Sequence, residues 1–330
     1  MGVNAGPAGA LLAIDAGNSK TDVVVLSPDG AVLGSARGGG FQPQVVGVEA
    51  AVDRLAEIAG RAWEAAGGSG EPGLSHVTAC LANADLPVEE EGLRLAIDAR
   101  GWAPSVRVHN DTFALLRAGL DEPRGVAVVC GAGINCAGMA PDGRTARFAA
   151  LGKLSGDWGG GGGLSEEALW HAARAEDGRG GPTELARALP AHFGLGTMAE
   201  LIEALHLGRI AHERRYELAP VLFRVAAADD PVALGLVHRL AEEVVALSTV
   251  ALGRLELLGE EAPVVLGGSV LAARHPQLEG RIVELLGVRA PRATIRFVTA
   301  PPVLGAGLLA LDEAGAPAEA GARLREAYAG

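Results

Sequence analysis

An order of expected strands and helices occurs twice along this chain, and this repeat constrains the fold more than any single motif. In the first half, apolar periodicity predicts three strands, a helix, a strand, a helix and a strand, near residues 10–15, 22–27, 31–37, 47–66, 76–81, 89–100 and 105–109. In the second half, it predicts three strands, a largely helical stretch, a strand, a helix, a strand and a helix, near 125–130, 134–139, 144–149, 164–258, 263–266, 276–287, 294–299 and 304–313. The repeat is one of order and not of residue identity.

Two alternating units of this kind predict an α/β protein with two mixed sheets that face each other across a ligand-binding cleft. We expect a first domain at residues 1–118 and a second domain at 119–313, which carries the helical insertion. A hinge near 118–124 would join them. A helix at about 314–330 could pack back on the first domain.

The charge pattern favours a small-molecule ligand. The chain has 330 residues and a formal net charge of −12. Without a basic run, such a chain is poorly suited to bind nucleic acid or an anionic membrane surface. Cys80, Cys130 and Cys136 have no CxxC spacing, which argues against a disulfide framework or a zinc site. Because we find no export signal and no apolar run of transmembrane length, we expect a cytoplasmic protein.

The segment Asp15-Ala16-Gly17-Asn18-Ser19-Lys20-Thr21 lies between two short apolar runs, so it predicts a turn between two strands. A glycine lets the backbone approach phosphate oxygens, and turn amides form a concavity that binds anions. Asp15 beside them could hold Mg²⁺ through water. The chain has only two lysines, Lys20 and Lys153, and both lie next to glycine-containing turns. The heptapeptide alone is equally compatible with an ordinary solvated turn.

A second glycine turn, Cys130-Gly131-Ala132-Gly133-Ile134-Asn135-Cys136, occupies the equivalent place in the second repeat. We expect it to be a second phosphate-holding turn. A Rossmann motif does not fit, because Cys136 stands where the third glycine belongs and a strand is expected to follow. A P-loop does not fit either, because the chain has no GKT or GKS.

Asn110-Asp111-Thr112 follows an expected strand and precedes an apolar helix start. An acid at the tip of a strand could take the proton of an attacking hydroxyl during phosphoryl transfer. A helix N-cap is the alternative role for Asp111, and the two roles can coexist.

Two further glycine-rich segments are candidates for ligand contact. Lys153-Leu154-Ser155-Gly156-Asp157-Trp158 leads into Gly159 to Gly163, after which Ser165 is expected to cap a helix. We interpret this segment as a ligand-contacting loop, and a plain linker is the alternative. Gly267-Gly268-Ser269 ends a buried-type strand and would allow a purine or ribose to approach the backbone. Alone, it is a weak signal.

Taken together, these segments resemble the N-acetylglucosamine kinase and BadF/BadG-type ATPase family, within the superfamily of sugar kinases, actin and heat-shock chaperones. The resemblance covers nearly the whole chain and implies two ribonuclease-H-like domains. It also implies ATP-dependent phosphorylation of a sugar hydroxyl, with Asp111 as general base and Asp15 positioning hydrated Mg²⁺. Asp157 and Asn135 would bond the sugar, and Gln42 falls where related kinases place a sugar-contacting amide. Related kinases are often dimers, so a homodimer is expected.

The chain departs from the family at the sugar loop. Related amino-sugar kinases have Gly-Asp-Glu-Gly-Ser, whereas this chain has Gly156-Asp157-Trp158-Gly159-Gly160. Trp158 could stack on a sugar or narrow the acetamide pocket, so the sugar could be N-acetylglucosamine, glucosamine or another modified sugar. Two other functions stay open: an ATP-gated activator of a reductase or dehydratase, which would need cluster-ligating cysteines, and a sugar-sensing regulator without catalysis.

Overall fold

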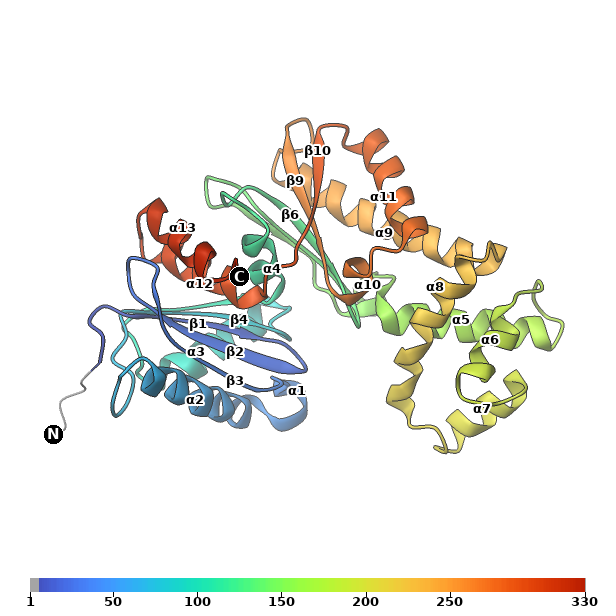
Figure 1. Cartoon of the computed structure of the whole chain (residues 1–330), viewed down its shortest axis with the longest axis horizontal. Coiled ribbons are helices and arrows are strands. Elements are labelled where there is room, and N and C mark those ends of the chain that lie inside the picture. The colour runs from blue at the N-terminus through green and yellow to red at the C-terminus, as the bar shows by residue number, and fades with distance from the viewer. Residues whose placement is uncertain (1–5, 330) are drawn as a thin grey trace. The chain divides into compact units, whose positions relative to one another are not determined.

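The computed structural model describes residues 6–329 and contains two five-stranded sheets (Figure 1). The strands of the first sheet are β1 (Leu11–Ala16), β2 (Lys20–Leu26), β3 (Val32–Gly39), β4 (His76–Leu81) and β5 (Val106–Asn110). Those of the second are β6 (Gly125–Cys130), β7 (Ile134–Met139), β8 (Thr145–Arg147), β9 (Ala262–Gly267) and β10 (Ala293–Phe297). The expected order of elements is therefore confirmed in both halves. Residues 1–5, where we looked for an export signal, lie outside the described part.

The first sheet has the strand order β3-β2-β1-β4-β5. β1 pairs antiparallel with β2 and parallel with β4, and β4 pairs parallel with β5. Every residue of β1 and β4 is buried, as expected for central strands covered on both faces. β3 is an edge strand whose residues are exposed or half-buried, apart from the buried Gly34. Because β1, β4 and β5 are parallel, their carboxyl ends meet at one edge of the sheet.

Helices cover both faces of the first sheet, as Figure 1 shows. On one face lie α1 (Pro43–Val46), α2 (Val48–Ala65) and α3 (Pro87–Asp98), and on the other lie α4 (Thr112–Ala118), α12 (Pro302–Glu313) and α13 (Ala318–Ala327). Trp63 and Trp102 are 1% and 6% exposed and pack in the core of the first unit. The buried face of α2 supplies much of this core through Val52, Leu55 and Ala59.

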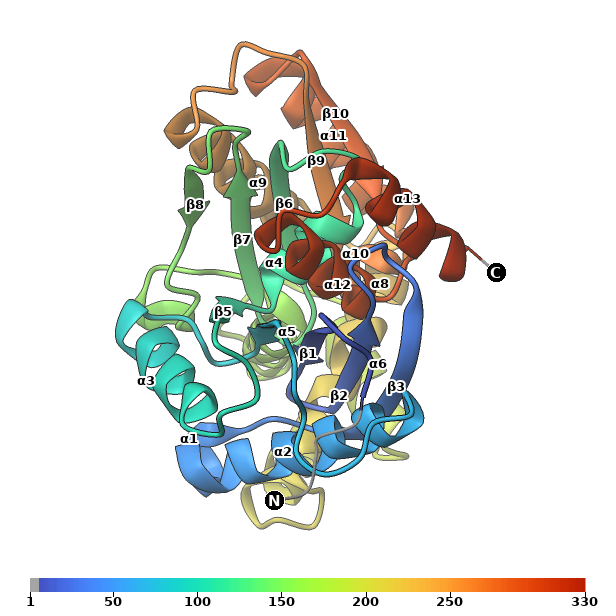
Figure 2. The same cartoon turned by 90° about the vertical axis from the view of Figure 1, so that its left-hand side faces the viewer.

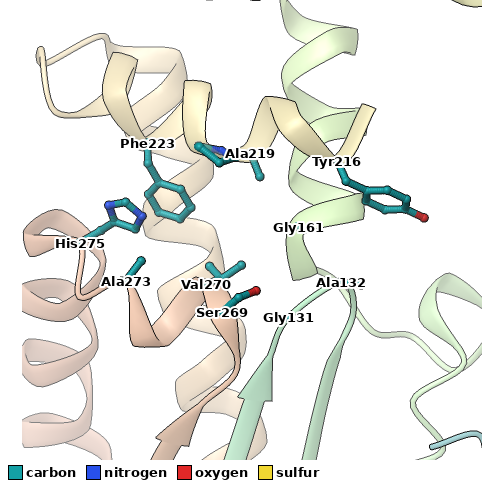
Figure 3. Close-up of a pocket in the computed structure, with 11 residues that line it drawn as sticks. Gly131, Ala132, Gly161, Tyr216, Ala219, Phe223, Ser269, Val270, Ala273 and His275 are labelled. Carbon is teal, nitrogen blue, oxygen red and sulfur yellow. The ribbon is translucent and has the colours of Figure 1, made fainter. Parts of the chain in front are cut away.

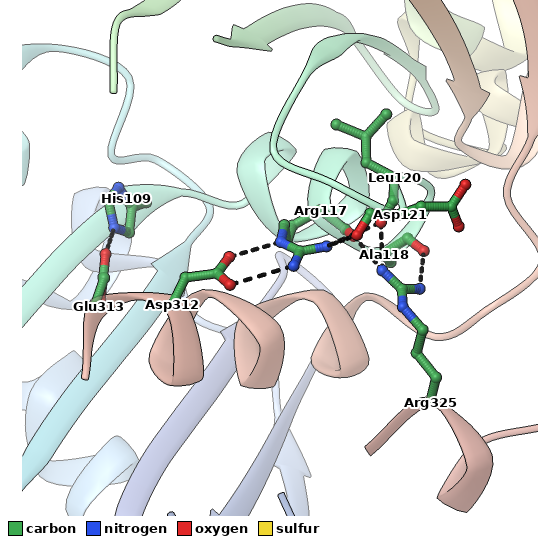
Figure 4. Close-up of polar contacts among 8 residues, drawn as sticks. All are labelled: His109, Arg117, Ala118, Leu120, Asp121, Asp312, Glu313 and Arg325. Carbon is green, nitrogen blue, oxygen red and sulfur yellow. Dashed lines mark hydrogen bonds and ion pairs between the residues drawn. The ribbon is translucent and has the colours of Figure 1, made fainter. Parts of the chain in front are cut away.

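Small residues let α12 approach α4 closely. A Cβ atom on Gly305 would lie 1.7 Å from the carbonyl oxygen of Ala114, so only glycine fits there. Buried Arg117 of α4 binds Asp312 of α12 through both Nε and Nη2, and Arg325 of α13 donates to the carbonyl of Ala118 (Figure 4). Arg325 thus satisfies a carbonyl group in the last turn of α4, which the helix itself leaves without an amide partner. His109, near the end of β5, forms a hydrogen bond with Glu313 at the end of α12.

The second sheet has the order β10-β9-β6-β7-β8, and Figure 2 shows β6, β7 and β8 in succession. Two helices, α10 (Ser269–Ala272) and α11 (Pro276–Arg289), follow β9. The insertion contains α5 (Gly160–Glu176), α6 (Leu185–His192), α7 (Met198–His206), α8 (Leu218–Ala226) and α9 (Pro231–Arg254), with short 3₁₀ turns at Gly152–Leu154 and His212–Glu217. The apolar face of α9 lies largely in the core, with Leu240 and Val244 fully buried. Within the described residues, no helix has the length and apolar character needed to cross a membrane.

Two compact units divide the chain. The first contains the described residues up to 127, residues 137–145 and those from 298 onward, and the second contains 128–136 and 146–297. By compactness, α12 belongs with the first unit, whereas the order of elements groups 304–313 with the second repeat. The domain limits of 1–118 and 119–313 therefore stay a prediction.

Candidate active site

The first glycine turn is a tight connection between β1 and β2. The Gly17 amide donates to the Lys20 carbonyl at 2.9 Å, and the Phe41 amide donates to the Gly17 carbonyl at 2.9 Å. Asn18 and Lys20 are exposed, as is Ser19 between them. Thr21, in contrast, is 1% exposed, and its hydroxyl donates to the Gly39 carbonyl. The turn thus presents three of its expected phosphate-binding residues outward.

Three carboxylates lie near this turn, and their environments differ. Burial, together with the charges of Asp111 and Asp22, raises the pKa of Asp15 to about 7, against the lowering effect of the Lys20 charge. Burial also raises the pKa of Asp22, but hydrogen bonds from Arg37 and Lys20 outweigh this effect and hold it below the usual value. Lys20 lies 3.2 Å from Asp22. This ion pair places the lysine charge beside the glycine turn.

Asp111 occupies the N-cap position of α4, but its side chain makes no capping hydrogen bond. Instead, Asn110 accepts a bond from the Thr112 amide at 3.0 Å. Burial raises the pKa of Asp111 to about 6, against the lowering effect of nearby backbone amides. A carboxyl that titrates just below neutral pH has the strength that general bases require. The expected cap role of Asp111 is therefore taken by its neighbour.

The loop after β4 contains polar residues that the sequence analysis missed. Asn83 donates to the side-chain oxygen of Asn18 and to the Phe41 carbonyl, and Asp85 accepts a bond from Asn110 at 2.8 Å. Gln42, an expected sugar ligand, donates to the Asn18 carbonyl at 3.2 Å. The sequence contained a signal for these residues, because they directly follow a fully buried strand. Asp15 and Asp111 lie at the ends of the two strands beside it.

The second glycine turn connects β6 and β7, and the start of α5 packs on it. The amides of Gly161 and Gly162 donate to the carbonyls of Gly131 and Ala132 at 2.7 and 3.0 Å. A Cβ atom on Gly160, whose φ is +73°, would lie 2.5 Å from the Ala132 carbonyl oxygen. Glycine is therefore required at Gly160 for both its backbone conformation and its close approach.

This contact corrects two expectations about the five-glycine run. Gly160 to Gly163 form the first turn of α5 and not a loop. Ser165 lies inside the helix, where its hydroxyl donates to the Gly161 carbonyl at 2.7 Å, so it is not the N-cap. The physical reason is that the carbonyls of the Gly131-Ala132 turn accept the amides of the first helical turn, which compensates for the low helix propensity of glycine.

A cavity of about 310 Å³ opens beside this second turn (Figure 3). Gly131 and Ser269 lie on one side, and the rings of Phe223 and His275 stack 3.9 Å apart on the other. Burial lowers the pKa of His275, which favours the neutral form of its ring. The remaining lining residues are Ala132, Gly161, Tyr216, Ala219, Pro220, Val270 and Ala273. Tyr216, Phe223 and His275 were not predicted, since none of them belongs to a glycine motif.

Gly268 brings the end of β9 against the end of β6. Its φ is +83°, and a Cβ atom there would lie 2.5 Å from the carbonyl oxygen of Cys130. This packing places Gly267-Gly268-Ser269 next to the Gly131 turn and along the same cavity. The two glycine motifs of the second unit therefore lie beside one cavity.

The expected sugar loop is polar and partly exposed. Asp157 accepts a hydrogen bond from Ser155, and Lys153 is exposed, with its amine 4.0 Å from Glu167. The side-chain oxygen of Asn135 accepts a bond from the amide of Cys136. Trp158 is 8% exposed, and the Arg239 guanidinium lies 4.2 Å above its ring. The ring face toward Arg239 is therefore closed to a sugar.

The environment of Asp15 fits a hydrated Mg²⁺ ion. No group of three His, Cys, Asp or Glu side chains in residues 6–329 is arranged to hold a metal. Mg²⁺ usually keeps several waters and uses one or two carboxylates together with substrate phosphates. A cation near Asp15 would offset the repulsion from Asp111 and Asp22 and favour the ionised carboxylate.

Comparisons with known proteins find sequence relatives of this chain and solved structures of the same fold. An N-acetyl-D-glucosamine kinase of Dictyostelium discoideum is 26% identical over 243 residues, which cover 71% of this chain and 75% of that protein. The solved structure of a provisionally named N-acetylglucosamine kinase from Chromobacterium violaceum has a TM-score of 0.67 and 23% identity, covering 91% of this chain and 98% of that one. A ROK family glucokinase from Streptomyces griseus, in complex with glucose and AMPPNP, has a TM-score of 0.56 and 16% identity, covering 92% and 100%.

The family model that matches this chain extends over both sheets. It is that of the BadF/BadG/BcrA/BcrD ATPase family, and it matches residues 12–310, from β1 through most of α12. Both glycine turns and Asp111 lie within the matched region. The chain belongs to the BadF/BadG/BcrA/BcrD ATPase family.

Proposed function

We propose that this protein is an ATP-dependent kinase that phosphorylates a hydroxyl of an amino sugar of the N-acetylglucosamine or glucosamine type. The observation that carries the proposal is the position of Asp111, a carboxyl with a pKa of about 6 at the same sheet edge as the first glycine turn and Asp15. Family membership and the kinase names of the relatives support the same activity.

Asp111 is the proposed general base. At neutral pH, a carboxyl with a pKa of about 6 is mostly ionised and can accept the proton of the attacking sugar hydroxyl. Because its side chain does not cap α4, it is available for this role. The transfer would proceed in line, and alignment and charge neutralisation would supply most of the catalysis.

The nucleotide contacts follow from the two glycine turns. We assign the phosphates to Gly17, Asn18, Ser19 and Lys20 in the first turn and to the Gly131-Ala132-Gly133 turn, with Thr21 supporting the first turn through its bond to β3. The 310 Å³ cavity beside Gly267, Gly268 and Ser269 would hold the nucleoside. Asp15 would hold Mg²⁺ through water, and this ion would neutralise phosphate charge.

The sugar contacts are assigned to five polar residues. Amides and carboxylates suit a ligand rich in hydroxyl groups, because they accept and donate hydrogen bonds with fixed geometry. The assigned residues are Gln42, Asn110, Asn135, Lys153 and Asp157. Their side chains do not distinguish N-acetylglucosamine from glucosamine, so the choice of sugar is left to the assay.

The assay measures ADP release with Mg-ATP and a panel of hexosamines, followed by mass spectrometry of the products. We expect sugar-stimulated ADP release and one phosphorylated sugar. Failure of every sugar to stimulate turnover would reject the proposal. Glucose and ribose serve as controls for general hydroxyl phosphorylation.

The two alternative functions have less support. An electron-transferring activator would need reactive cysteines at a cluster, whereas Cys80, Cys130 and Cys136 are all buried and burial raises the pKa of each. A sugar sensor would bind ligand tightly without forming product. A cytoplasmic location and a homodimer remain part of our proposal, and light scattering of the purified protein tests the dimer.

A further inference from the structure

The loop after β4 occupies a central place in the first unit. β4 pairs with β1 on one side and with β5 on the other, and all three strands are parallel. Asp15 lies near the end of β1, and Asp111 directly follows β5. The topology therefore puts residues 82–86 between the first glycine turn and the proposed base.

Asn83 connects this loop to two segments of the proposed site. Its side-chain amide donates to the Asn18 side-chain oxygen at 3.0 Å and to the Phe41 carbonyl at 3.2 Å. Its φ of 65° lies in the left-handed region, which asparagine tolerates better than most residues. Its own carbonyl accepts a bond from Gln44 at 3.3 Å. One residue thus joins the glycine turn, the segment after β3 and α1.

Asp85 connects the same loop to the catalytic segment. It accepts a hydrogen bond from the side-chain amide of Asn110 at 2.8 Å. The side-chain oxygen of Asn110 in turn accepts a hydrogen bond from the backbone amide of Thr112. Both polar atoms of the Asn110 side chain, next to Asp111, are therefore hydrogen-bonded. Glu89 holds the loop by accepting the backbone amides of Asp85 and Leu86.

We propose that Asn83 and Asp85 are positioning residues that fix the first phosphate turn and the Asn110-Asp111 segment in one geometry for phosphoryl transfer. This inference rests on the proposed kinase function. Neither residue is assigned a proton or a phosphate. They act through Asn18 and Asn110, and a shift of the base relative to the phosphate turn by about 1 Å would cost on the order of 10²-fold in rate.

Variants at Asn83 separate the side-chain bonds from the backbone conformation. Asn83→Gly keeps the left-handed backbone and removes both amide bonds, whereas Asn83→Ala also adds backbone strain. We expect Asn83→Gly to lower kcat by on the order of 10-fold to 10²-fold with little change in the KM for ATP or sugar. An unchanged kcat in Asn83→Gly would remove Asn83 from the proposal.

Variants at Asp85 separate positioning from charge. Asp85→Asn retains an oxygen that can accept the Asn110 amide, and Asp85→Ala does not. We expect Asp85→Ala to lose on the order of 10²-fold in kcat and Asp85→Asn to recover most of it. Equal losses in the two variants would show that the charge matters, which contradicts a positioning role. Arg94→Ala is the control, since Arg94 pairs with Glu91 on the exposed face of α3.

Hydrogen exchange of the same proteins tests the contacts of Asn83 and Asp85 without a measurement of kinase activity. We expect Asn83→Gly to increase exchange in peptides covering residues 15–21 and 40–46, and Asp85→Ala to increase it in those covering 110–116, with no change in Arg94→Ala. Unchanged exchange in both loop variants would overturn the inference. If the wild-type protein phosphorylates no sugar, the kinase proposal fails, and the exchange result alone then decides whether the loop holds these segments.

Discussion

The two glycine turns occupy equivalent places in the two repeats, but they are held by different kinds of interaction. The first turn lies among charges, with Asp15, Asp22 and Lys20 nearby, and amide side chains such as Asn83 and Gln42 fix its position. The second turn has no such charges in its own sequence, and the backbone of a glycine helix start fixes it from one side. The difference shows that one topological position can supply electrostatic control in one repeat and shape in the other. The first turn thus lies among ionisable side chains, and the second lies beside the cavity lined by Phe223 and His275.

The strongest test of this comparison is Asp111→Asn. If the first unit performs the chemistry, this variant loses its base, and kcat falls by about 10²- to 10⁴-fold while ATP and sugar still bind. Product formation gives the rate, and isothermal titration gives the two affinities. Turnover equal to that of wild type would remove Asp111 as the base.

A second test breaks the shape-based turn. Gly160→Ala introduces a side chain at a positive φ and against the Ala132 carbonyl, so we expect a loss of about 1–3 kcal/mol or more in the free energy of unfolding. Gly163→Ala is the matched control, because the same helix offers open space there. That variant should gain about 0.5–1 kcal/mol. Urea denaturation measures both, and equal effects would contradict the close contact.

The pKa values of Asp15 and Asp111 in the first unit are raised. For this reason, the reaction rate and the folding stability should depend on pH with opposite signs. The rate should rise with pH through about 6 as Asp111 loses its proton. Stability should fall as pH rises from about 4 to about 7, because the folded state keeps the Asp15 proton that the unfolded state releases. Asp15→Asn should reduce this fall in stability, and the part that remains comes from Asp111, whose pKa is also raised. A stability that instead rises over this range in wild type would contradict the burial of an unpaired Asp15.

The smallest expected effect lies in the cavity of the second unit. His275→Ala removes the ring stacked on Phe223, and aromatic stacking of this kind contributes about 0.5–1.5 kcal/mol. Because this ring also lines the cavity proposed for the nucleoside, we expect a higher KM for ATP, with kcat and the KM for sugar unchanged. Steady-state kinetics with each substrate varied in turn measure the three values. A change confined to the sugar KM would place the nucleoside elsewhere.

Much of the fold followed from the sequence because local patterns and tertiary structure agree there. The strands around Asp15 and Asp111 are short apolar runs with turn residues at their ends, and the structure forms them as expected. The glycine run at 159–163 failed as a prediction because its helical state depends on carbonyls about 30 residues earlier in the chain. No local pattern reports such a contact.

The site was predictable where its residues follow strands and not where they lie on helices. Asn83 and Asp85 could have been found, since polar residues after a central buried strand share an edge with those after its neighbours. Phe223 and His275 could not, because each fits an ordinary helix or helix start, and only the packing of α8 beside α10 brings the rings together.

The helix start on the second turn also offers a spectroscopic signal. The amides of Gly161 and Gly162 are bonded to carbonyls of the turn itself, so they exchange with solvent only when the turn and the helix separate. A nucleotide bound against the turn would slow this separation and, with it, the exchange of both amides. Two adjacent glycine resonances would then report occupancy of the site directly, without a label and without catalysis.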